Sequence, residues 1–71
     1  MKLYELIKQK RENKRLTQED VAQILNVTRQ SVQNWENNKR AIPNELLAEY
    51  FSLLEFNAHE VLSAFDFLEN I

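Results

Sequence analysis

Apolar residues recur along the chain at the three- and four-residue spacing of amphipathic helices. Near the amino-terminal end, Leu3, Leu6 and Ile7 share one helical face. The stem of Lys10 continues the same face one turn later. This stripe predicts a first helix over about residues 2–13.

Residues that typically begin helices precede the next apolar positions. Thr17 is followed three positions later by Asp20, which is the pattern of an N-cap whose partner bonds back to the cap. Thr28 stands in the same way before a short helix that would bury Val32 and Trp35. These caps predict a second and a third helix joined by only three residues.

Two more helices fit in the remaining length. Pro43 marks the start of a fourth helix, which carries the apolar cluster at 46–54. Asn57 and Glu60 repeat the capping pattern before a fifth helix over about 58–70. The fold class that we expect is therefore all-α, with five helices.

Composition narrows both the fold and the chemistry. The 71 residues allow one small domain, which we place at 1–71. The absence of cysteine excludes a disulfide scaffold and thiolate zinc sites. The absence of glycine excludes phosphate-binding glycine loops and Asn-Gly hairpins. His59 has no second histidine or cysteine nearby, so we expect neither a metal site nor a cofactor.

Charge is distributed unevenly along the chain. Residues 1–40 hold nine basic and five acidic residues and have a charge of +4, whereas residues 41–71 hold six acids, no lysine and no arginine. The net charge of −2 therefore joins a basic half to an acidic half. This asymmetry favours a polyanionic partner on one side of the molecule, although two solvated faces would give the same count.

The second and third helices carry the strongest functional signal. Helices joined by three residues cross steeply, so a small residue is needed at the crossing, and Ala22 supplies it. Asn26 can adopt the left-handed conformation that the turn requires. The outer face of the third helix then carries Arg29, Gln30, Gln33 and Asn34. Arginine pairs bidentately with guanine, and glutamine and asparagine with adenine, in the major groove of DNA.

The block 16–36 has a specific family pattern. The positions that carry it are Gln18, Ala22, Val27, Ser31, Val32, Trp35 and Glu36. Over about residues 3–62, the chain resembles the lambda-repressor-like, Cro-type helix-turn-helix family. The resemblance implies a helix-turn-helix at about 17–37, with the third helix in the major groove.

The resemblance also implies roles for individual positions. The base-reading residues would be Arg29, Gln30, Gln33 and Asn34. The phosphate contacts would come from Thr17, Gln18, Thr28, Asn37, Lys39 and Arg40, and Gln18 would also brace the first base-reading residue. Arg11 and Glu36 match an inward ion pair that ties the first helix to the end of the third.

Four positions depart from the family, whose members usually carry glycine there. They are Arg15, Asn26, Asn38 and Glu55. Asparagine tolerates left-handed geometry, but arginine and glutamate would adopt it at a cost of roughly 1–2 kcal/mol. We therefore expect left-handed asparagines around the third helix, and altered loops at Arg15 and Glu55.

The expected fifth helix has two apolar sides. One, formed by Ala58, Val61, Leu62, Phe65 and Leu68, should close the core. The other, formed by Ala64, Phe67 and Ile71, would lie in water in a monomer. A two-fold dimer through this helix would cover that side and place two recognition helices about one DNA turn apart.

These observations predict a sequence-specific regulator of transcription that binds double-stranded DNA. We expect a homodimer that represses by occluding a palindromic operator. We expect it to be cytoplasmic, because no apolar run approaches the roughly 20 residues of a membrane span. No nucleophile–base pair or cofactor loop is visible, so an enzyme is not expected.

Two alternatives stay open. One is an antitoxin-like protein whose acidic residues neutralise a basic partner while the protein regulates its own promoter. The other is a protein-binding module without DNA contact.

Overall fold

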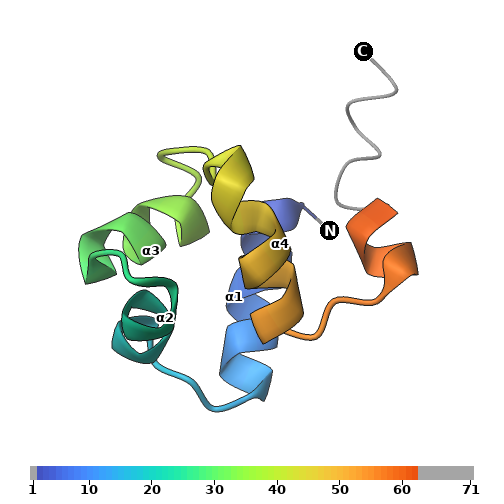
Figure 1. The fold of residues 1–71 in the computed structure, drawn as a ribbon, viewed down its shortest axis with the longest axis horizontal. Coiled ribbons are helices and arrows are strands. Elements are labelled where there is room, and N and C mark those ends of the chain that lie inside the picture. Colours follow the sequence, from blue (N-terminus) through green and yellow to red (C-terminus); the bar gives the residue numbers. More distant parts are fainter. Residues whose placement is uncertain (1, 63–71) are drawn as a thin grey trace.

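Four helices follow one another along the chain, and a fifth begins after them. The computed structural model describes residues 2–62. The helices are α1 (Leu3–Asn13), α2 (Gln18–Leu25), α3 (Arg29–Glu36) and α4 (Asn44–Leu53), and residues 58–62 form the start of the fifth. No strand occurs within 2–62, and the all-α prediction is confirmed. In Figure 1, α2 and α3 lie on one side of α1 and α4, and the fifth helix begins on the other.

The helix starts use the caps predicted from the sequence. Thr17 Oγ1 accepts a hydrogen bond from the Asp20 amide at 3.0 Å, and Asp20 Oδ2 accepts one from the Thr17 amide at 2.8 Å. These bonds with Thr17 lower the pKa of the Asp20 carboxyl. Thr28 Oγ1 accepts from the Ser31 amide at 3.1 Å and so caps α3. The capping pattern before the fifth helix is also present, with Asn57 and Glu60 bonded reciprocally at 2.8 and 3.0 Å.

The helices α1 to α4 are each followed by a non-glycine residue in the left-handed region. These residues are Arg15, Asn26, Asn38 and Glu55, with φ between 58° and 59°. In each case the next amide bonds to a carbonyl five residues earlier, which is the closing bond of a Schellman motif. Examples are Leu16 to Arg11 at 3.1 Å and Val27 to Ala22 at 2.9 Å.

The expectation of altered loops at Arg15 and Glu55 is therefore wrong. Both residues keep the left-handed conformation, as the two asparagines do. The physical reason lies in the residue that follows each of them. Leu16 and Phe56 pack against the core, and only a left-handed residue before them turns the chain so that they can do so. Burial of these apolar side chains offsets the backbone cost.

The core lies where α2 and α3 meet α1 and α4. It consists of Ile7, Val21, Ala22, Leu25, Val32, Trp35, Tyr50 and Leu54. Ala22 is buried, as expected for the small residue where α2 and α3 pack together. The rings of Trp35 and Tyr50 meet edge to face with centroids 5.8 Å apart, which joins α3 to α4. Among the described helices, none is both long and apolar enough to cross a membrane.

Candidate nucleic-acid interface

The helix α3 has one buried and one exposed face. Val32 and Trp35 are buried in the core. Arg29, Gln30 and Gln33 are exposed, and Asn34 is half-buried. Because a helix turns by 100° per residue, the alternation of these positions sets the four predicted base-reading residues on the side that faces away from the core.

The amino-terminal end of α3 favours an anionic partner. Thr28 and Ser31 are joined by a bond of 2.9 Å between their hydroxyl oxygens, and Thr28 caps the helix. The first turn contains no acidic residue, so no side-chain carboxylate within this turn offsets the positive end of the helix dipole. Arg29 adds a full positive charge at the same end.

The turn after α3 presents further polar and basic residues. Asn37, Lys39 and Arg40 are all exposed. Asn38 has a φ of 59°, and the Lys39 amide bonds to the Asn34 carbonyl at 2.8 Å. The left-handed turn thus bends the chain sharply after the end of α3, and Lys39 and Arg40 come directly after this bend.

Basic side chains differ in whether an acid neutralises them. On α1, Lys10 Nζ lies 2.6 Å from Glu60 Oε1, and Lys14 beyond its end pairs with Glu55 at the same distance. Within residues 2–62, no such pair is formed by Arg29, Lys39 and Arg40, nor by Lys2, Lys8 and Arg15. The cations of α3 and its following turn therefore keep their charge available for an external anion.

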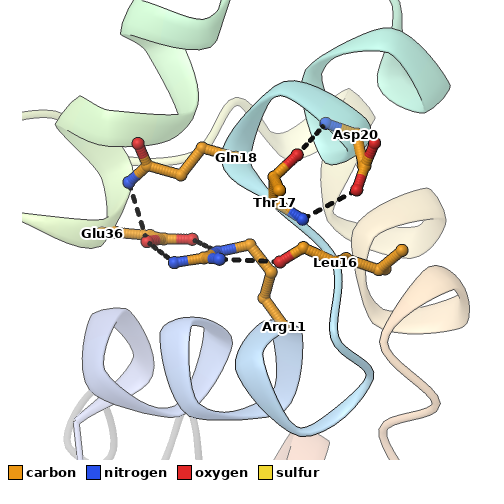
Figure 2. Close-up of polar contacts among 6 residues, drawn as sticks. All are labelled: Arg11, Leu16, Thr17, Gln18, Asp20 and Glu36. Carbon is orange, nitrogen blue, oxygen red and sulfur yellow. Dashed lines mark hydrogen bonds and ion pairs between the residues drawn. The ribbon is translucent and has the colours of Figure 1, made fainter.

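A buried ion pair joins α1 to the end of α3. Arg11 and Glu36 are only 8% and 4% exposed. Figure 2 shows the Arg11 guanidinium between the Glu36 carboxylate and the Leu16 carbonyl, with bonds of 2.6 and 3.0 Å to the former and 2.8 Å to the latter. The hydrogen bond with Glu36 raises the pKa of Arg11, against the opposite effect of burial. The pair implied by the family resemblance is thus present.

Gln18 belongs to the same network. Its amide nitrogen donates to Glu36 Oε1 at 3.1 Å, so the first residue of α2 is tied to the last residue of α3 (Figure 2). This bond was not anticipated, because residues 18 positions apart leave no spacing signal. It uses one amide proton, and the second proton remains to donate to the phosphate that the resemblance implies.

Tyr50 was not singled out by the sequence as a functional residue. Its side chain is completely buried, and its hydroxyl has no hydrogen-bond partner among the described residues. Burial raises the pKa of the Tyr50 hydroxyl, and the nearby Glu36 carboxylate adds to this effect. The apolar pattern treated Tyr50 as an ordinary core residue and gave no indication of an unpaired polar atom.

The other predicted positions have simpler environments. Thr17 and Thr28 are exposed at their helix starts, next to Gln18 and Arg29 in sequence. His59 is exposed, and within residues 2–62 no three His, Cys, Asp or Glu side chains gather as metal ligands would. The dimer candidates Ala64, Phe67 and Ile71 lie outside the described residues.

Comparison with known proteins identifies the family. A family model described as helix-turn-helix matches residues 7–60, which include all four described helices apart from the first turn of α1. No curated protein and no solved structure matches the chain. The match covers most of the chain and contains the capped α2–α3 pair with its exposed polar face. The chain belongs to the lambda-repressor-like, Cro-type helix-turn-helix family of DNA-binding transcription regulators.

Proposed function

We propose that this regulator is a sequence-specific repressor that places α3 in the major groove of its operator. The observation that carries the proposal is the exposed face of α3, which presents Arg29, Gln30 and Gln33. Arg29, and Lys39 and Arg40 in the turn that follows, have no acidic partner among residues 2–62. Arginine and glutamine both pair bidentately with base edges, which gives sequence discrimination. The half-buried Asn34 completes this face.

Phosphate contacts would set the position of the domain on the duplex. The candidates lie at the start of α2, at the start of α3 and in the turn after α3: Thr17, Gln18, Thr28, Asn37, Lys39 and Arg40. Contacts of this kind supply affinity and orientation, whereas base contacts supply specificity. The charge of +4 over residues 1–40 supports such an arrangement. Occupation of the operator would exclude the transcription machinery, and the protein itself would change no bond in the DNA.

A homodimer on a palindromic operator is part of this proposal. Ala64, Phe67 and Ile71 would form the interface through the second apolar side of the fifth helix. In sedimentation experiments, the wild-type protein should have the mass of a dimer and Phe67→Asp that of a monomer, because a carboxylate at the interface would be stranded without water. An unchanged mass of Phe67→Asp would contradict this interface.

The proposed function is tested by selection of bound duplexes from a random DNA pool. The wild-type protein should enrich one sequence with two related half-sites. A reporter with that sequence placed over its promoter should then fall in output when the protein is expressed. Enrichment without repression would retain sequence-specific binding but contradict the repressor assignment, whereas no enrichment at low salt would contradict both.

A second candidate is an antitoxin-like role, in which the protein also neutralises a basic protein. An open groove between α2 and α4 favours it, with apolar walls that include Ile24, Leu25 and Leu53 and an acidic residue, Glu49. Ile24 is 56% exposed, and residues 41–71 contain no lysine or arginine. Coexpression with a basic protein from a neighbouring reading frame tests this role. Release of that protein by Ile24→Asp, but not by Arg40→Ala, would support it, and release by neither would exclude the groove.

A further inference from the structure

Gln30 and Asn34 are joined on the recognition face of α3. The amide nitrogen of Gln30 donates to Asn34 Oδ1 at 3.1 Å, one helical turn further along. Gln30 is exposed and Asn34 is half-buried. The exposed Gln30 side chain is therefore held by Asn34, which is less exposed.

The hydrogen-bonding capacity of Gln30 remains suited to adenine. A glutamine amide has two protons on its nitrogen and an oxygen that accepts. Asn34 takes one proton, so the second proton and Oε1 are left. These are the donor and acceptor that pair with N7 and the N6 amino group of adenine. The bond to Asn34 also fixes which way round the Gln30 amide lies.

Asn34 itself is less suited to read a base. Bidentate pairing of an asparagine with adenine uses Oδ1 as the acceptor, and in Asn34 one of the two lone pairs of this atom already accepts from Gln30, which ties the amide to its neighbour. Its side chain is also partly covered, unlike those of Arg29, Gln30 and Gln33. The Asn34 side chain is therefore better placed to hold Gln30 than to contact a base.

We propose that Asn34 is a positioning residue, which orients the Gln30 amide so that Gln30 reads an adenine. This inference rests on the proposed function, because it assigns different roles to two residues of the same exposed face of α3. Orientation before binding reduces the rotamer freedom that a long side chain would otherwise lose on the DNA. Gln30 would then contact the base, and Asn34 would act only through Gln30.

The test compares variants in the selection from random duplexes described above. Gln30→Ala identifies the operator position that Gln30 reads, where the preference for adenine should fall about 5- to 150-fold. Asn34→Ala should reduce the preference at that same position by about 1.4- to 2.3-fold. Asn34→Asp keeps an acceptor for the Gln30 amide, so it should bind all DNA more weakly but retain the preference for adenine. Gln33→Ala, on the same face, should alter a different base position and leave the preference for adenine at this position unchanged.

The outcomes separate the inference from the proposed function. If Asn34→Ala alters a different base position, Asn34 reads its own base and the inference is wrong. Loss of the adenine preference in Asn34→Asp, as in Asn34→Ala, would also overturn it. No enriched sequence for the wild-type protein would instead contradict the proposed function. Without DNA, side-chain couplings of Gln30 measured by NMR should show a broader rotamer distribution in Asn34→Ala, and an unchanged distribution contradicts the inference even if that variant binds poorly.

Discussion

Lys14 Nζ lies 2.6 Å from Oε2 of Glu55, and this ion pair joins the turn after α1 to the turn after α4. Glu55 itself, like Arg15 next to Lys14, has a positive φ. The hydrogen bond with Lys14 lowers the pKa of Glu55. Both partners are substantially exposed, so the pair orients the two turns without contributing much to stability.

Replacement of Arg15 by glycine should stabilise the domain. Glycine adopts the left-handed conformation without the penalty of a Cβ atom, so Arg15→Gly should raise the free energy of unfolding by about 1 kcal/mol relative to Arg15→Ala. For a domain of this size, about 1 kcal/mol corresponds to a rise in melting temperature of about 4–8 °C. Thermal unfolding followed by circular dichroism measures the difference. Arg15→Ala is the matched control because it removes the charge but keeps Cβ, and equal melting temperatures would show that the turn is not strained.

Removal of one partner of the Arg11–Glu36 pair should strongly destabilise the fold. Either Arg11→Met or Glu36→Leu would strand a buried charge and should cost about 3–5 kcal/mol. The double variant leaves no unpaired charge, so its loss should be clearly smaller than the sum of the two single losses. Urea unfolding of all four proteins closes the cycle. Strict additivity would mean that the two side chains contribute independently.

Tyr50→Phe is expected to preserve or increase stability. The Tyr50 hydroxyl is buried without a partner among the described residues, so its removal deletes an unsatisfied polar group and should contribute up to about 1 kcal/mol. Tyr50→Leu, in contrast, loses the edge contact with Trp35 and should lower the free energy of unfolding. A clearly lower free energy of unfolding in Tyr50→Phe would reveal that the hydroxyl has a partner, such as a buried water molecule.

Arg40→Ala and Gln30→Ala should weaken DNA binding in different ways. Arg40 is expected to contact phosphate, so its loss should weaken binding to all duplexes alike and reduce the slope of log K against log salt by about one. Gln30→Ala should cost about 1–3 kcal/mol on the selected operator and little on random DNA. Titrations of labelled duplexes at several salt concentrations measure both effects. The assignments would be reversed if Arg40→Ala changed base preference and Gln30→Ala changed only the salt slope.

Much of the fold could be predicted because its signals are local. Thr17 with Asp20, and Asn57 with Glu60, define helix starts within four residues, and the bonds found are those that the pattern implies. The small residue Ala22, close to the short α2–α3 connection, likewise predicted where the two helices cross.

The missed features depend on contacts between distant parts of the chain. Arg15 and Glu55 were expected to avoid the left-handed region on local preference, but burial of Leu16 and Phe56 determines their conformation. The bond from Gln18 to Glu36 depends on how α2 meets α3. The candidate base-reading face was visible in the sequence, whereas the bond that links Gln30 to Asn34 required coordinates.

The four left-handed turns have a consequence for local motion. The two at Arg15 and Glu55 are the less favourable for their residue types, and the Lys14–Glu55 ion pair places them next to each other. The two at Asn26 and Asn38 flank α3. Local opening, seen as faster amide hydrogen exchange, should therefore concentrate at Leu16 and Phe56. The amides of Val27 and Lys39 should exchange more slowly, so that α3, the proposed recognition helix, is held at both ends by the two turns that open less often.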